Sequence, residues 1–171
     1  MDMARPIVIT AYYKEDPALL KRCMASVRGQ KVPTEHLLVA DGHPQPWIDS
    51  EPVRHLRLDR AHADYGNTPR GIGALLAVSE QYPAIMMLDA DNWIEPQHVE
   101  ICLRAAASSP GTDFVIARRL FRRPDGSIMP IPDESGPEHS YANGLHGARP
   151  PFLHVVSPHA FNRQSTQAPP A

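Results

Sequence analysis

The ten residues AIMMLDADNW, 84–93, consist of a continuous apolar run followed by two aspartates, Asp89 and Asp91. A run without polar alternation is typical of a strand that is buried on both faces, as in a parallel sheet. Alternate carboxylates at the end of such a strand repel each other unless a cation joins them, and Mg²⁺ and Mn²⁺ prefer oxygen ligands. The stretch therefore predicts a buried strand and a divalent-metal site, against the alternative of two solvated turn residues.

Helical patterns separate five strand-like runs along the chain. The runs are Ile7–Ala11, Leu37–Asp41, His55–Leu58, Ala84–Asp89 and Phe114–Ala117. Alternation of strands and helices predicts an α/β fold: a mostly parallel, Rossmann-like three-layer sheet with helices on both faces. Right-handed crossovers bring the carboxyl ends of the strands to one edge, where ligands bind in open α/β sheets.

Start and stop signals accompany the helical patterns. Asp16 and Pro17 predict the N-cap and the first residue of the first helix, and Gly29 predicts its end. Thr68 predicts the cap of the second helix. The third helix is expected to start near Glu95-Pro96, and Pro110-Gly111 is expected to stop it.

Composition divides the chain near residue 129. Nine of the 19 prolines lie in residues 124–171, and no Asp or Glu follows Glu138. We expect residues 1–129 to form the α/β domain, with a small hairpin around Pro124-Asp125-Gly126. Residues 130–171 are expected to form a proline-rich, loosely ordered, irregular tail that supplies at most one edge strand.

Charge and hydropathy exclude several classes of protein. The 17 basic and 19 acidic residues leave no basic excess, so we expect no nucleic-acid partner. No apolar run approaches the roughly 20 residues of a membrane helix, and the N-terminal residues MDMARPIVIT do not form a signal peptide. Two cysteines, Cys23 and Cys102, exclude a disulfide scaffold. These features favour a cytoplasmic protein.

Two further polar clusters are expected at the same edge of the sheet as the aspartate pair. One runs from Thr10 to Tyr13 after the first strand, and the other is Asp41-Gly42 after the second. Arg70 lies in the first turn of the second helix, where the helix dipole disfavours a cation. A bound anion would reverse that effect, and the alternative is an exposed arginine with its head in water.

The ordered set of these pieces resembles the nucleotide-sugar-binding half of glycosyltransferase family 2, which has the GT-A fold. The resemblance rests on DPALLKRCMASVRGQ (16–30), HLLVADG (36–42) and GNTPRGIGALLAVSEQYPAIMMLDADNWIEPQHVE (66–100), and it runs from about Ile7 to Ala117. It implies an inverting, metal-dependent glycosyltransferase. Such an enzyme transfers a sugar from a nucleoside-diphosphate sugar to an acceptor, which the sequence does not name.

The resemblance also implies residue roles. The implied nucleotide-binding residues are Thr10, Tyr12, Asp41, Arg70 and Asp89. Asp41 would contact the base, with Thr10 and Tyr12 lining the same pocket. Asp89 would lie towards the ribose, and Asp91 together with Asp89 would hold Mn²⁺ or Mg²⁺ at the diphosphate.

The chain departs from the family pattern in two places. Gly42-His43-Pro44 follows Asp41 where the family usually has Asp-Asp or Asp-x-Ser, and the family's catalytic base lies beyond the hairpin, where this chain has its acid-poor tail. No catalytic residue is therefore assigned. Two alternatives stay open: a donor-binding remnant without turnover, and a nucleotidyltransferase. The latter normally has a glycine-rich basic loop after the first strand, where this chain has AYYKED (11–16).

Overall fold

The computed structural model describes residues 5–108, 114–117, 120–123, 125–131 and 154–156. In chain order, the elements are β1 (Ile7–Tyr12), α1 (Pro17–Arg28), β2 (Glu35–Ala40), the 3₁₀ helix η1 (Pro46–Ser50), β3 (Arg54–Arg57), α2 (Asn67–Ser79), β4 (Ile85–Met87), α3 (His98–Ser108), β5 (Phe114–Ile116) and β6 (His154–Val156). The strands form one sheet in the order β3-β2-β1-β4-β6-β5. β1 to β4 are parallel, which confirms the predicted Rossmann-like α/β fold.

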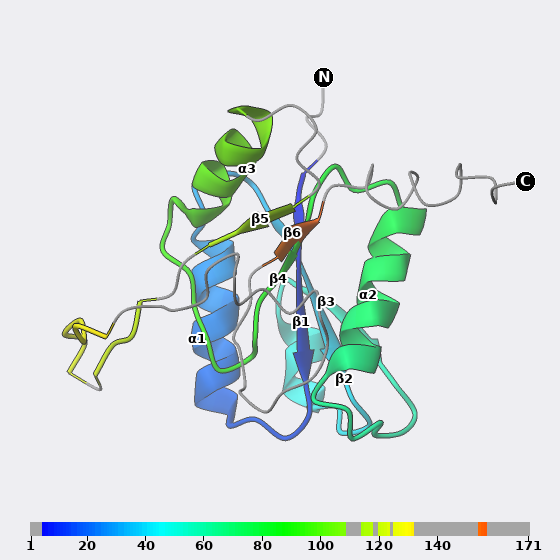
Figure 1. The fold of residues 1–171 in the computed structure, drawn as a ribbon. Helices are drawn as coiled ribbons and strands as arrows, with labels where there is room; N and C mark the ends of the chain where they lie inside the picture. The colour runs from blue at the N-terminus through cyan, green and yellow to red at the C-terminus, as the bar shows by residue number, and fades with distance from the viewer. Residues whose placement is uncertain (1–4, 109–113, 118–119, 124, 132–153, 157–171) are drawn as a thin grey trace, which may run out of the picture.

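Helices cover both faces of the sheet, with α1 and α3 on one side and α2 on the other (Figure 1). The alternation of β1 side chains explains these layers. Val8 packs with α1 and α3 around Cys23 and Cys102, whereas Ile7 and Ile9 pack with the α2 side of the core. Within the described part of the chain, no helix combines the length and apolar character needed to cross a bilayer.

The first helix begins and ends as its sequence signals predict. Asp16 is the N-cap of α1, and its carboxylate accepts a hydrogen bond from the backbone of Ala18 at 2.7 Å. Pro17 occupies the first helical position, where a missing N–H has no consequence. Gly29 is the C-cap, and its N–H donates to the carbonyl of Ala25 at 2.9 Å.

The second and third helices begin at other residues than predicted. α2 starts at Asn67 after the left-handed Gly66, so the prediction of Thr68 as the cap is wrong. The capping oxygen comes instead from Asp64, whose carboxylate accepts from the backbone N–H and the hydroxyl of Thr68. α3 starts at His98, slightly after the predicted position, and the expected stop at residues 110–111 lies outside the described residues.

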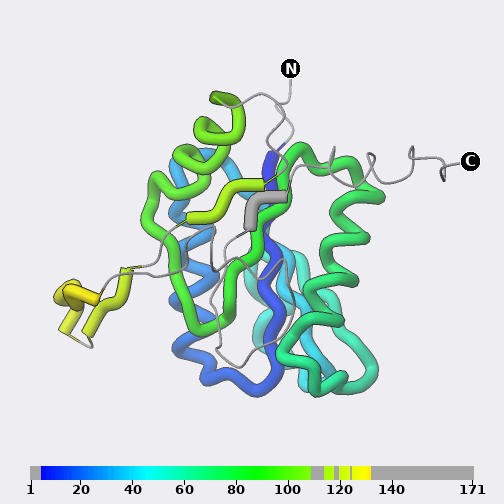
Figure 2. The backbone as a smooth tube through the Cα atoms, viewed as in Figure 1, coloured from blue at the N-terminus to red at the C-terminus, as the bar shows by residue number. Residues whose placement is uncertain are grey.

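The predicted hairpin is confirmed in the residues that the structure describes. Arg122 and Ile128 form an antiparallel bridge, and the N–H of Met129 donates to the carbonyl of Phe121 at 2.7 Å. Gly126 turns the chain at φ +86°, a conformation that favours glycine. The hairpin extends away from the sheet (Figure 2).

The last described strand, β6, corrects one expectation about the tail. It pairs antiparallel with β4 on one side and with β5 on the other, so it is an interior strand and the prediction of at most an edge strand is wrong. The reason is non-local: β4 and β5 each offer an unpaired edge, and a strand between them completes both ladders. Residues 132–153 and 157–171 lie outside the described residues, and the domain boundary near residue 129 stays a prediction.

Candidate functional site

The three predicted polar clusters meet at the carboxyl edge of the sheet, by which we mean the carboxyl ends of β1, β2 and β4. Tyr12 is the last residue of β1, and Asp41 directly follows β2. Asp89 and Asp91 lie in a turn after β4, closed by a hydrogen bond from Asn92 N–H to the Asp89 carbonyl at 3.0 Å. β1 lies between β2 and β4, so this edge contains the reversal of strand order where open α/β sheets bind ligands.

Asp89 forms an ion pair with Arg70 across this edge. Nη2 of Arg70 donates to Oδ1 of Asp89, and Nη1 donates to the carbonyl of Tyr65 at 2.9 Å. The arginine side chain is 27% exposed, so the alternative of a cation with its head in water is wrong. Burial raises the pKa of Asp89, the Arg70 guanidinium opposes that rise, and the nearby charges of Asp91 and Glu15 add to it.

Asp91 differs from Asp89 in being exposed, and its carboxylate has no hydrogen bond or ion pair among the described residues. Its backbone carbonyl accepts from Arg22 at 3.2 Å, and the Arg22 guanidinium lies over the ring of Trp93. The described residues contain no cluster of three or more potential metal ligands. Two carboxylates nevertheless fit Mg²⁺ or Mn²⁺, because these ions commonly take one or two carboxylates and complete their shell with substrate phosphates and water.

Thr10 lies in the core rather than at the surface of the carboxyl edge. It is fully buried, and its hydroxyl lies 2.9 Å from Nε2 of His36 and 3.7 Å from Sγ of Cys23. These contacts place it in the core on the α1 side. A role for Thr10 in the nucleotide pocket stays a prediction.

Tyr12 is held by a hydrogen-bond network around its hydroxyl. The hydroxyl accepts from the backbone N–H of Gln45 at 2.9 Å and lies 2.7 Å from Nε2 of His55. Nδ1 of His55 lies 2.8 Å from the carboxylate of Asp49, which can only accept when ionised, so Nε2 accepts the tyrosine proton. Burial raises the pKa of Tyr12, and the hydroxyl therefore stays neutral. The ring is 2% exposed and packs in the hydrophobic core with Leu20 and Ile48, so its role in lining a nucleotide pocket stays a prediction.

Asp41 is bound by a residue that sequence reasoning missed, His62. The backbone N–H of His62 lies 3.2 Å from each carboxylate oxygen, and Nδ1 of its ring lies 2.6 Å from Oδ1. Gly42 permits this approach: it has φ +74°, and a Cβ there would lie 2.2 Å from the backbone nitrogen of Ala61. His62 could have been found from its position, since the loop from β3 to α2 must return past the same edge.

That loop, residues 59–66, has unusual backbone angles. Ala63, Tyr65 and Gly66 all have positive φ, and Tyr65 is 85% exposed. Left-handed angles at residues other than glycine are uncommon and concentrate at functional sites. Asp64 supports the loop through Thr68, whose hydrogen bond lowers the pKa of the Asp64 carboxyl. The loop thus presents His62 and the carbonyl of Tyr65 to the site while it starts α2.

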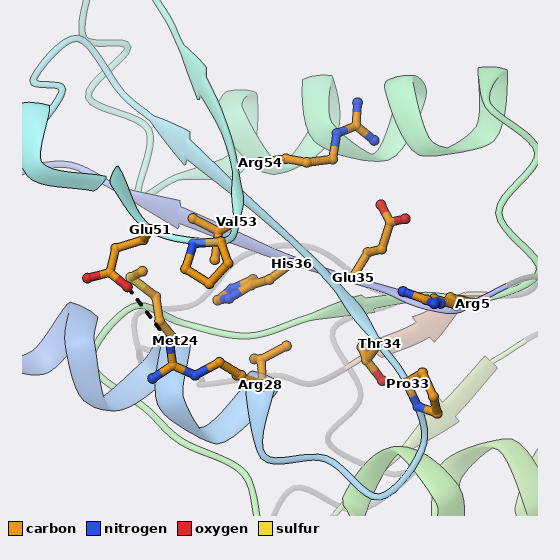
Figure 3. A pocket seen from close by; sticks show the side chains of 12 residues that line it. Arg5, Met24, Arg28, Pro33, Thr34, Glu35, His36, Glu51, Val53 and Arg54 are labelled. Carbon is orange, nitrogen blue, oxygen red and sulfur yellow. Dashed lines mark ion pairs between the residues drawn. The ribbon is translucent and has the colours of Figure 1, made fainter. Parts of the chain in front are cut away.

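A cavity of about 610 Å³ lies at the opposite end of the sheet (Figure 3). It is lined by the starts of β2 and β3 and the end of α1. Two of its charged residues form ion pairs with a lining or neighbouring carboxylate: Arg28 pairs with Glu51 at 3.8 Å, and the guanidinium of Arg54 pairs with Glu80. Burial lowers the pKa of His36 in its wall to about 3, so that ring is neutral. The carboxyl edge, where Asp91 has no partner among the described residues, is the candidate site.

Comparisons with known proteins identify the family and the fold of the chain. The family model for glycosyl transferase family 2 matches residues 7–165. No curated protein matches the sequence.

Solved structures share the fold at low sequence identity. S. aureus TarS 1–349 in complex with UDP-GlcNAc is 11% identical with a TM-score of 0.62, over 96% of this chain and 48% of that one. The mannosyltransferase PcManGT from Pyrobaculum calidifontis, in complex with GDP-Man and Mn²⁺, is 15% identical with a TM-score of 0.59, over 94% and 46%. CMP:2-keto-3-deoxy-manno-octonic acid synthetase complexed with CTP is 10% identical with a TM-score of 0.57, over 97% and 79%. The chain spans about half the length of the first two proteins.

Proposed function

The chain belongs to glycosyl transferase family 2, and on that premise we propose that its carboxyl edge binds a nucleoside-diphosphate sugar and a divalent metal ion for transfer of the sugar to an acceptor. The observation that carries this proposal is the pair of carboxylates after β4: Asp91, which has no partner in the part of the chain that the structure describes, and Asp89, which is bound to Arg70. Asp89 and Asp91 supply negative charge for a metal ion, and Arg70 beside them supplies a cation for the phosphates.

Asp91 and Asp89 would hold Mn²⁺ or Mg²⁺, which stabilises the charge that develops on the leaving diphosphate. Arg70 lies beside Asp89 and can bind phosphate oxygens, because a guanidinium has five N–H donors and here uses two towards the protein. Tyr12 would line the pocket on the β1 side. Asp41 would lie at the base end of the nucleotide.

The transfer would be inverting, with one displacement at the anomeric carbon. A carboxylate base would accept the proton of the attacking hydroxyl, and we assign that role to no residue. Because no residue is assigned as the base, the alternative of donor binding without turnover is kept beside the proposed transfer. Both cysteines are free and buried, which supports our proposal of a reducing, cytoplasmic location.

A nucleotidyltransferase is the second candidate function. The observation that favours it is the shared fold of the CTP-bound synthetase, of which this chain covers 79%. Against it, residues 11–16, which comprise the end of β1 and the loop after it, contain no glycine for a phosphate-binding loop. The two reactions release different products: a nucleoside diphosphate from sugar transfer, and pyrophosphate from nucleotidyl transfer.

Calorimetry tests the proposed binding. UDP, GDP and their sugar derivatives are titrated into the full chain with Mn²⁺ and again with EDTA. We expect at least one of them to bind more tightly with Mn²⁺, and equal affinity under both conditions contradicts the metal site. Product analysis with each bound sugar nucleotide then separates turnover from binding alone, and pyrophosphate release from CTP and a sugar acid supports the second candidate.

A further inference from the structure

The carboxylate of Asp41 is not the group that a ligand at the carboxyl edge meets first. Asp41 is 5% exposed, and both of its oxygens face the backbone N–H of His62. The His62 side chain is 21% exposed and covers the carboxylate through Nδ1. A ligand approaching the end of β2 therefore meets an imidazole ring that is backed by a buried carboxylate.

This arrangement fixes the proton on one nitrogen of the ring. An ionised carboxylate can only accept, so Nδ1 of His62 donates to Asp41. In the neutral ring the other nitrogen, Nε2, is then an acceptor. Among the described residues, no hydrogen bond uses Nε2 of His62. The edge thus has an oriented acceptor that the described protein does not itself use.

A second Asp–His pair in the same chain shows what such an acceptor does. Asp49 faces Nδ1 of His55, and Nε2 of His55 accepts the hydroxyl proton of Tyr12 at 2.7 Å. The two pairs have the same order of contacts. They differ in that Nε2 of His55 has an internal partner, whereas Nε2 of His62 has none among the described residues and belongs to a partly exposed side chain.

The position of His62 suits the far end of a nucleotide whose phosphates lie at Arg70. Nη1 of Arg70 donates to the carbonyl of Tyr65, three residues after His62. Successive Cα atoms are about 3.8 Å apart, so the Cα atoms of His62 and Tyr65 lie within roughly 11 Å of each other. An extended nucleotide that contacts Arg70 through its phosphates can therefore place its base against the His62 ring.

We propose that His62, held by Asp41, reads the nucleobase by accepting an imino N–H, and this inference rests on the proposed function. Uracil N3–H and guanine N1–H are donors on the base edge, whereas the corresponding nitrogens of cytosine and adenine are acceptors and meet the lone pair of Nε2 unfavourably. The site therefore selects uridine or guanosine nucleotides over cytidine or adenosine nucleotides of the same size. Asp41 is a positioning residue, because it acts through the ring.

The test compares matched nucleotides with matched variants by calorimetry in Mn²⁺. UDP is compared with CDP, and GDP with ADP. We expect the wild-type chain to bind the imino N–H member of at least one pair about tenfold more tightly than its partner, the scale of one hydrogen bond. His62→Ala is expected to bind both members equally. His62→Gln, which keeps a neutral acceptor, is expected to retain part of the preference.

His43→Ala is the control, since His43 is exposed at the same edge and contacts the ring of Tyr13 edge to face rather than the carboxylate of Asp41. It is expected to keep the wild-type preference. If His62→Ala unfolds at the wild-type temperature and still shows the full wild-type preference between nucleotides, His62 does not read the base. That result would not contradict metal-assisted nucleotide binding. If His62→Ala does not fold, an unchanged preference in His62→Gln and in Asp41→Asn together overturns it. Failure of the wild-type chain to bind any of the four nucleotides contradicts the proposed function itself.

Discussion

The carboxyl and amino ends of the sheet differ in backbone conformation. Among the described residues, Gly42, Ala63, Tyr65 and Gly66 all have positive φ at the carboxyl end, and two of these four have a Cβ that resists it. At the amino end, Gln81 is the one such residue in the described part of the chain. Unfavourable angles persist only where surrounding structure enforces them. Two of the three described non-glycine residues with positive φ therefore lie at the end of the sheet where the ligand would bind.

The two ends also differ in how they treat charge. At the carboxyl end, Asp41 is 5% exposed and the side chain of Asp89 is 19% exposed, so each carboxylate depends on one specific partner. At the amino end, the ion pair of Arg54 and Glu80 is more than a third exposed on both sides and is replaceable by water. A ligand that replaces the partner of a buried charge can gain free energy, because charges interact more strongly in the protein interior than in water. An exposed ion pair offers a ligand little such gain.

The largest effect is expected from Gly42→Ala. The new Cβ lies 2.2 Å from the backbone of Ala61 at φ +74°, so strain and overpacking combine to a loss of about 3 kcal/mol in the free energy of unfolding. Gly71→Ala is the control, because a Cβ there has no neighbour within 4 Å and α2 favours alanine. Urea denaturation measures both. Equal stability of the two variants contradicts the difference drawn between the loop and the helix.

Asp91→Asn is expected to weaken metal-assisted nucleotide binding by about 2 kcal/mol, the scale of one charge-assisted contact. The fold should be unaffected, because this carboxylate has no partner among the described residues. Asp125→Asn in the hairpin is the control, since Asp125 is exposed and serves the turn through Ser127. Calorimetry with Mn²⁺ and with EDTA measures the loss of nucleotide affinity in each variant. A similar loss in both variants contradicts the placement of the metal.

At the amino end, His36 predicts a dependence of stability on pH. Burial lowers the pKa of this ring from its ordinary value of 6.5 to about 3, so the unfolded chain binds this proton first and stability falls as pH falls below about 6.5. Between pH 6.5 and 5 the loss is about 1–2 kcal/mol. His36→Gln should remove this part of the slope, whereas His43→Gln at the exposed position should not. Urea denaturation at several pH values is decisive, and identical slopes in all three chains contradict the burial of a neutral ring.

The smallest effect concerns the start of α2. Asp64→Ala removes the oxygen that accepts a hydrogen bond from the backbone N–H of Thr68. The free energy of unfolding should therefore fall by about 1 kcal/mol, the scale of an N-cap. The exposed Asp59, in the same loop, supplies the control Asp59→Ala. Thermal denaturation compares the two. If Asp59→Ala destabilises as much as Asp64→Ala, the loop is supported by charge in general rather than by this cap.

Local signals in the sequence were sufficient for much of the fold. The apolar run of 84–88 predicts a buried strand because few other structures bury such a run. Asp16-Pro17 predicts the start of α1 because the capping carboxylate and the proline ring both act within the first turn of the helix. The position of Asp89 and Asp91 at the carboxyl edge followed from topology alone.

Contacts between distant residues could not be read in the same way. β6 joins the interior of the sheet through pairing with β4, about 70 residues earlier, and its short sequence contains no sign of that register. The pairs of Asp41 with His62 and of Asp89 with Arg70 span 21 and 19 residues. They exist because separate loops return to one edge. A single sequence predicts that edge but not which side chains meet there.

Hydrogen exchange with and without a nucleoside diphosphate and Mn²⁺ tests most directly that the carboxyl end is the ligand-binding end. We expect slower exchange in 40–42, 61–70 and 89–92 when the ligand is added, and no change in 34–36 and 51–54 around the amino-end cavity. Protection confined to the amino-end segments, or no protection at either end, would contradict the account.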